Sequence, residues 1–165
     1  MRRFLLVAIA LLLTFPAQAQ NPTDPPPGQH PILTVFARGV QIYTCQISNG
    51  SAQWVFQAPE ATLYNTAGVK VGTHSAGPIW TNKDGSSVKG EVVQKNPAPE
   101  PNAIPWLLLK AAGVEGNGIL AKVEFIRRSD THGGTAPTAG CESSRLQTVS
   151  RIPYTATYIF YTAKP

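Results

Sequence analysis

The stretch Val40-Gln-Ile-Tyr-Thr-Cys-Gln-Ile-Ser-Asn-Gly-Ser-Ala-Gln-Trp-Val-Phe-Gln57 decides the fold class. Residues 40–47 place their side chains alternately on two faces and are rich in β-branched and aromatic types, which is typical of a strand. Residues 53–57 repeat this composition, and Asn49-Gly50 between them favours a tight hairpin turn. The stretch therefore predicts two antiparallel strands.

Outward from this hairpin, further short strands are predicted and are separated by turn signals, at 61–65, 69–71, 86–94, 119–128 and 152–161. On 119–128, alternation places Val123 and Phe125 toward the core and Arg128 toward solvent. Residues 104–112 are predicted as one short helix, because Pro105 suits a first turn and good helix formers follow it. With a long loop at 129–144, the pattern predicts an all-β domain, an antiparallel sandwich or barrel.

The N-terminus reads as an export signal. Residues 1–19 carry two arginines, an apolar run and a small-x-small site at Ala17-Gln18-Ala19, which is typical of a cleaved signal peptide. The apolar run is too short to cross a bilayer, and no later segment is apolar enough to do so. We expect a proline-rich linker at 20–37 and a single domain at 38–165, located in the periplasm or outside the cell.

Two cysteines, Cys45 and Cys141, follow the signal peptide. An even cysteine count in an exported chain predicts a disulfide, and two buried free thiols are the alternative.

The charge pattern argues against nucleic-acid binding. The chain has 14 Lys+Arg against 9 Asp+Glu, a net charge of +5, and loss of Arg2 and Arg3 with the signal peptide leaves +3. A nucleic-acid footprint requires basic residues clustered on one face, and here Arg127-Arg128 is the one adjacent pair outside the signal.

Chemistry-bearing residues gather in two segments, 72–87 and 129–140, which we predict to form a loop face that binds a small molecule or a polysaccharide. Trp80 follows Gly-Pro and is the candidate for an exposed aromatic platform, whereas burial is the commoner position for a large aromatic side chain. The candidate ligand-binding residues are His74, Trp80, Asp84, Arg128, Thr131 and His132.

The alternative is a metal-dependent enzyme, because imidazole and carboxylate groups together suit several divalent ions. Its candidate ligands are His74, His132, Asp84 and Asp130. Their spacing matches no zinc motif, and the chain has no Gly-x-Ser-x-Gly nucleophile elbow. We therefore predict no resident cofactor and favour a non-catalytic role, as a ligand- or glycan-binding module or as a structural one.

A set of motifs spans most of the chain: Gly39-Val-Gln-Ile-Tyr-Thr-Cys45, Ala58-Pro-Glu-Ala-Thr-Leu63, Gly77-Pro-Ile-Trp80, Ile104-Pro-Trp-Leu-Leu-Leu109, Thr131-His-Gly-Gly-Thr-Ala-Pro137 and Pro153-Tyr-Thr-Ala-Thr-Tyr158. Together they resemble a family of secreted bacterial and fungal proteins classed as a domain of unknown function. The resemblance implies export and a single domain, and it supplies no activity. Fungal relatives often carry the label malate dehydrogenase. This sequence does not fit that label, because it lacks a Gly-x-Gly-x-x-Gly turn between a strand and a helix.

Overall fold

The structure is a computed structural model that describes residues 21–163, and its first two strands form the hairpin expected from the sequence. Strand β1 (Gln29–Ser48) turns directly into β2 (Ser51–Tyr64), and Ser48 pairs with Ser51. Asn49 and Gly50 both have positive φ, 51° and 78°, as a two-residue hairpin turn requires. The predicted hairpin is confirmed.

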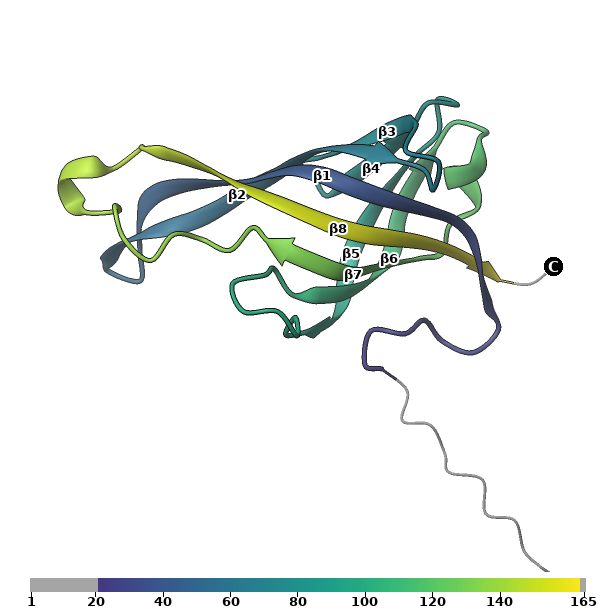
Figure 1. Cartoon of the computed structure of the whole chain (residues 1–165), viewed down its shortest axis with the longest axis horizontal. Coiled ribbons are helices and arrows are strands. Elements are labelled where there is room, and N and C mark those ends of the chain that lie inside the picture. Colours follow the sequence, from purple (N-terminus) through teal and green to yellow (C-terminus); the bar gives the residue numbers. More distant parts are fainter. Residues whose placement is uncertain (1–20, 164–165) are drawn as a thin grey trace, which may run out of the picture.

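Eight antiparallel strands follow one another around a closed barrel in chain order, and β1 completes the ring by pairing with β8 (Figure 1). The remaining strands are β3 (Lys70–Ser75), β4 (Ile79–Asn82), β5 (Ser87–Asn96), β6 (Trp106–Glu115), β7 (Phe125–Gly133) and β8 (Val149–Ala163). The predicted all-β antiparallel class is therefore confirmed, in its barrel form.

The strands differ greatly in length, and this leaves one end of the barrel open. β1, β2 and β8 run on together as a long ribbon (Figure 1), whereas β3 and β4 have six and four residues. β2 pairs with β3 only from Ala61 onward, and β5 pairs with β4 only up to Lys89. The earlier part of β2 and the later part of β5 therefore flank an opening.

The predicted helix at 104–112 is wrong: residues 106–115 form strand β6, paired with β5 on one side and β7 on the other. The cause is burial on both faces. Leu109 is 1% exposed in the core, and Leu108, which pairs with Arg127 on the outer face, is also only 4% exposed. Residues 21–28 are tied to this outer face by an ion pair between Asp24 and Arg127 (3.2 Å). A strand covered on both faces reads as an unbroken apolar run and loses its alternation.

The strand predicted at 119–128 is wrong in two respects: where the strand begins, and which of its residues face the core. Ile119–Lys122 is a 3-10 helix, η1, and the strand begins only at Phe125. In the strand as it forms, Ile126 is fully buried in the core. Because alternate residues of a strand share a face, Arg128 lies on the same face as Ile126. Arg128 therefore lies toward the barrel interior, although the sequence pattern placed it toward solvent.

Three other boundaries also bear on the predictions. β1 begins at Gln29, so residues 29–37 are strand and not linker. β7 extends to Gly133, so the predicted loop at 129–144 is a connection at 134–148 that contains a second 3-10 turn, η2 (Ser143–Arg145). The predicted signal peptide, 1–19, lies outside the described residues.

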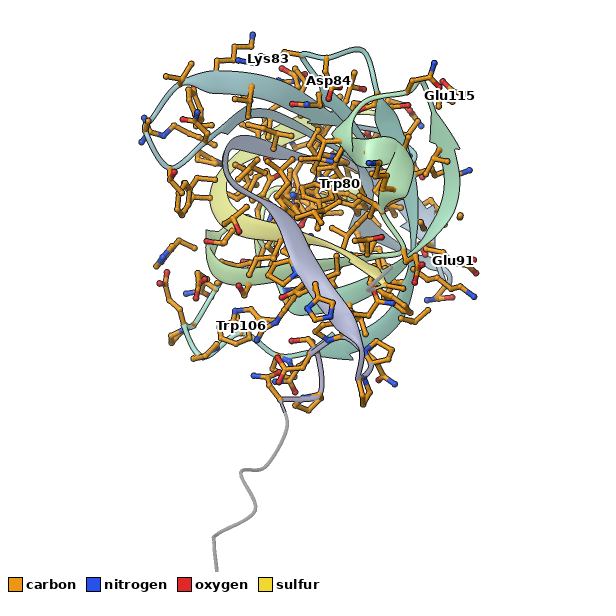
Figure 2. All side chains as sticks on the ribbon, turned by 90° about the vertical axis from the view of Figure 1, so that its right-hand side faces the viewer. Trp80, Lys83, Asp84, Glu91, Trp106 and Glu115 are labelled. Carbon is orange, nitrogen blue, oxygen red and sulfur yellow. A yellow bond between two sulfur atoms is a disulfide. The ribbon has the colours of Figure 1, made fainter. Side chains whose placement is uncertain are left out.

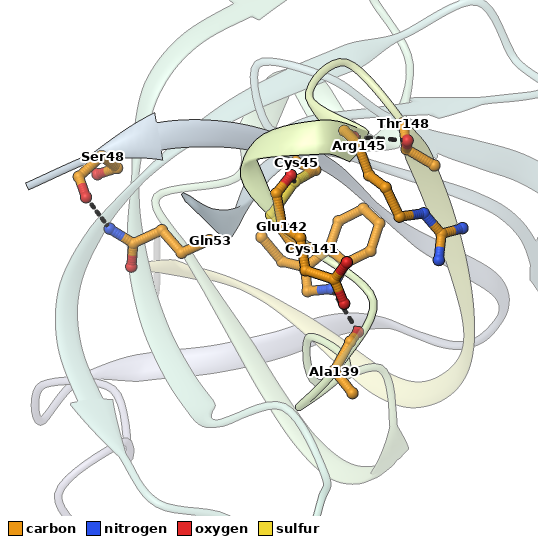
Figure 3. The surroundings of a disulfide bond; sticks show 9 residues. Cys45, Ser48, Gln53, Ala139, Cys141, Glu142, Arg145 and Thr148 are labelled. Carbon is orange, nitrogen blue, oxygen red and sulfur yellow. Dashed lines mark hydrogen bonds between the residues drawn. A yellow bond between two sulfur atoms is a disulfide. The ribbon is translucent and has the colours of Figure 1, made fainter. Parts of the chain in front are cut away.

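The connection at 134–148 is fixed to the β1–β2 ribbon (Figure 3). A disulfide joins Cys45 to Cys141, as predicted, across a sequence separation of 96 residues. Trp54 Nε1 donates a hydrogen bond to the Ala139 carbonyl (3.0 Å), and the backbone of Cys45 bonds to Gln147 and Thr148. These contacts hold the connection against the far end of the β1–β2 ribbon.

Candidate functional site

A cavity of about 600 Å³ lies at the open end of the barrel, and all eight strands contribute to its lining. Most of its surface is aromatic or aliphatic, including Tyr43, Phe56, Trp80, Ile104, Leu107 and Leu109. Its polar lining comprises Gln57, His74, Lys95, Arg128 and Tyr158. Three of the predicted ligand-binding residues, His74, Trp80 and Arg128, therefore line the same cavity.

Trp80 forms the inner end of this cavity and is not an exposed platform. It is 1% exposed and lies in the middle of the barrel when the molecule is viewed from its closed end (Figure 2). Its ring stacks on His74 at 4.2 Å between centroids and meets Tyr158 edge-on at 5.2 Å. The Gly-Pro that precedes Trp80 suggested a surface loop, but β3 and β4 turn there and carry both rings inward.

A glycine on the next strand makes room for the indole. A Cβ built on Gly90 of β5 would lie 3.0 Å from Trp80 Cζ3 and 3.0 Å from Leu109 Cδ2. Both distances are shorter than ordinary van der Waals contact, so a larger residue at this position would displace the Trp80 ring.

His74 is held as a neutral ring against Trp80. It is 3% exposed, and its Nδ1 donates to the Ile79 carbonyl at 3.0 Å. Burial lowers the pKa of His74 to about 3; the Ile79 hydrogen bond opposes the shift and the charge of Arg128 adds to it. His74 is therefore uncharged at neutral pH and serves as a wall of the cavity.

Arg128 and Tyr158 are neighbours across β7 and β8. The Arg128 Nε donates to the Pro105 carbonyl at 3.0 Å, which fixes the guanidinium at the cavity wall. Tyr158 is fully buried, and its hydroxyl lies near that of Tyr154 but makes no hydrogen bond of ordinary geometry within residues 21–163. Tyr158 was not among the candidate ligand-binding residues predicted from the sequence, although its place in the alternating pattern of 152–161 was available as a signal.

Thr131 supports this wall from behind. It is 2% exposed, and its hydroxyl donates to the Ile104 carbonyl at 2.6 Å. The Tyr43 hydroxyl donates to the Gly134 carbonyl at 2.7 Å. Ile104 and Tyr43 both line the cavity, so these bonds orient its lining.

Asp84 lies apart from the cavity, at the closed end of the barrel, near the coil of η1 (Figure 2). Its carboxylate accepts hydrogen bonds from the Ser86 hydroxyl (2.6 Å), the Ser86 backbone N–H (2.9 Å) and the Ile119 N–H (2.9 Å). The hydrogen bond from the Ser86 hydroxyl, followed by those from Ile119 and the Ser86 backbone, holds the pKa of Asp84 well below its usual range. Asp84 therefore anchors η1.

His132 and Asp130 line a second hollow, of about 750 Å³, on the outer face of the barrel. His132 pairs with Glu100, and Asp130 accepts a hydrogen bond from the Ser129 hydroxyl at 3.0 Å. Phe36, which also lines this hollow, is 45% exposed, so the hollow is a surface feature.

The four metal-ligand candidates do not assemble into a site. His74 lies in the interior cavity, Asp84 at the closed end, and Asp130 and His132 on the outer face. Among residues 21–163, no group of three or more His, Cys, Asp or Glu side chains is placed to hold a metal ion.

The part of the chain that the structure describes contains no helix with the length and hydrophobicity needed to cross a membrane.

Neither curated proteins nor solved structures gave a match to this chain. A family model, described as a protein of unknown function (DUF3455), matches residues 26–162. This match covers the barrel and its cavity almost completely, and the chain belongs to the DUF3455 family.

Proposed function

We propose that this protein is a non-catalytic binding protein that holds a small, largely apolar molecule inside the open end of its barrel. The observation that carries the proposal is the cavity itself. Its volume of about 600 Å³ falls within the range of about 300–1,000 Å³ that is usual for small-molecule sites. Like such sites, it combines an apolar lining with a few fixed polar groups.

A buried polar atom at the cavity wall supports the same proposal. The Tyr158 hydroxyl is buried and, in the described part of the chain, makes no hydrogen bond of ordinary geometry. A buried unsatisfied group costs about 1–3 kcal/mol. A ligand that carries a hydrogen-bond acceptor would remove part of this cost, which favours a polar group at one end of the ligand.

Exposed apolar side chains at the mouth of the cavity also support the proposed binding of an apolar molecule. Phe56 on β2 and Val92 on β5 line the cavity from opposite sides of the opening, yet they are 50% and 49% exposed. Exposed apolar side chains around an opening favour the entry of an apolar ligand. The disulfide between Cys45 and Cys141 supports a site in an oxidising compartment, which is where an exported protein operates.

The test uses the fluorescence of N-phenyl-1-naphthylamine, an uncharged probe that brightens in apolar sites. We expect saturable binding to the purified protein. Val92→Trp should narrow the mouth and weaken binding by about tenfold or more, equivalent to about 1.4 kcal/mol.

Val93→Trp is the matched control, because Val93 is the next residue of β5, is 45% exposed and does not line the cavity. It should leave the probe affinity almost unchanged. The proposal is wrong if the purified protein does not enhance the fluorescence, or if both variants bind as the unmodified protein does.

A further inference from the structure

The charge of the cavity lining is one-sided. Arg128 and Lys95 line it, and no aspartate or glutamate does. Lys95 is exposed at the rim, whereas Arg128 is partly buried and lies on the same face of β7 as the core residue Ile126. A buried or half-buried cation is costly unless an anion faces it.

Arg127, the residue before Arg128, shows how this chain balances the charge of a partly buried arginine. Arg127 points to the outer face, where it forms an ion pair with Asp24 at 3.2 Å and lies 5.7 Å from the centre of the Trp106 ring. Arg128 has no carboxylate partner among residues 21–163, and its one hydrogen bond joins Nε to the Pro105 carbonyl. Since a guanidinium carries five N–H donors, the four N–H groups at its two Nη atoms remain available.

The electrostatic effect of Arg128 reaches three other strands around the cavity. Burial raises the pKa of Tyr43 and of Tyr154 and lowers that of His74, and the positive charge of Arg128 lowers the pKa of all three. Tyr43 lies on β1, His74 on β3 and Tyr154 on β8. Arg128 therefore lies near these three groups, and none of them neutralises its charge, because all three are uncharged at neutral pH.

The geometry points to Arg128 as the anchor for an anionic head group, so that the ligand class is an apolar body ending in a carboxylate or phosphate. This inference rests on the proposed function of the cavity. Two Nη atoms can donate a pair of parallel hydrogen bonds to two oxygens of one head group. Tyr158 pairs with Arg128 in the β7–β8 register and lines the same cavity, and its buried hydroxyl would donate a third.

The apolar part of such a ligand would lie against Trp80, Leu107 and Leu109, which line the same cavity. Lys95 at the rim would attract the anion during entry without holding it, because an exposed lysine is well solvated.

The test is a titration series with one alkyl chain and four head groups: dodecanoate, dodecyl phosphate, dodecanol and dodecylamine. Each is measured below its micellar concentration by displacement of N-phenyl-1-naphthylamine. We expect at least one of the two anions to bind roughly ten- to a hundredfold more tightly than the alcohol, which is the range that a charge-assisted hydrogen bond supplies. The comparison of dodecanoate with dodecyl phosphate then decides between the two anions.

Arg128→Met should abolish the preference for anions while dodecanol still binds, and Arg127→Met should leave the preference intact. The comparison of head groups uses the unmodified protein, so it tests the preference for anions even if Arg128→Met fails to fold. Equal binding of anion and alcohol, or tightest binding of the amine, would overturn the anchor while leaving the cavity as a binding site. If none of the four displaces the probe and the probe itself does not bind, the proposed function fails as well.

Discussion

Replacing Trp80 by alanine should be among the most damaging single changes in the barrel. The indole is 1% exposed, stacks on His74 and lies edge-on to Tyr158 and Phe160, with ring centroids 5.2 and 6.1 Å away. Truncation of a fully buried large aromatic side chain costs about 3–5 kcal/mol. Because the lost ring forms the inner end of the cavity, we expect a loss in the upper half of that range.

The assay is urea unfolding followed by far-UV circular dichroism, which does not depend on the tryptophan that is removed. A domain of this kind has a total stability of about 5–15 kcal/mol, so the expected loss would shift the midpoint by a large fraction of its value. Phe36→Ala is the matched control, since Phe36 is an aromatic residue that is 45% exposed on the outer face. It should cost about 1 kcal/mol or less.

A loss for Trp80→Ala as small as that of the control would refute the placement of the ring. It would mean that Trp80 lies at the surface, as the preceding Gly77-Pro78 suggested. The cavity would then lack its inner end, and the proposed function would lose its structural basis.

Three further predictions concern pH and covalent structure. Since the pKa of His74 is about 3 when folded and about 6.5 when unfolded, the unfolded state binds more protons between these values, and stability falls with acidification by about 1.4 kcal/mol per pH unit. His74→Phe should flatten this slope between about pH 6.5 and pH 5, as measured by urea midpoints; an unchanged slope would assign it to other groups. For Asp84 the folded pKa lies below the unfolded value, so its contribution is present above about pH 4 and is lost as the pH falls toward the folded value. Asp84→Asn should therefore lower the melting temperature at neutral pH and approach the unmodified protein in strong acid, whereas an equal difference at both would show that its charge is irrelevant. Replacing Cys45 and Cys141 together by serine opens a loop with a separation of 96 residues, which corresponds to about 4–5 kcal/mol in the chain-entropy model. An unchanged unfolding free energy for this double variant would mean that the ribbon and the connection are fixed without the covalent bond.

Local signals in the sequence predicted much of the fold. The Asn49-Gly50 turn, the alternation beside it and the pairing of Cys45 with Cys141 depend on neighbouring residues or on a simple count, and all three are confirmed. The secondary structure of residues 106–112, by contrast, depends on which parts of the chain pack against them. Their leucines are compatible with either a helix or a strand, and only the burial of both faces of β6 decides between the two.

The sequence singled out six candidate ligand-binding residues, and the structure places three of them, His74, Trp80 and Arg128, around one cavity. Their role in binding stays a prediction. The sequence pattern could not show that Gly90 leaves room for the Trp80 indole. It also placed Arg128 toward solvent, because the 3-10 turn at Ile119–Lys122 shifts the phase of the strand that follows. That shift turns Arg128, which has no carboxylate partner among the described residues, toward the cavity.

Anomalous diffraction from crystals grown with ω-bromododecanoate locates both ends of the bound ligand, because the bromine marks one end of its alkyl chain and the carboxylate marks the other. We expect the bromine peak inside the barrel, among Trp80, Leu107 and Leu109, with the carboxylate density on the guanidinium of Arg128. A bromine peak in the outer hollow beside Phe36, or a carboxylate that lies away from Arg128, would contradict the account.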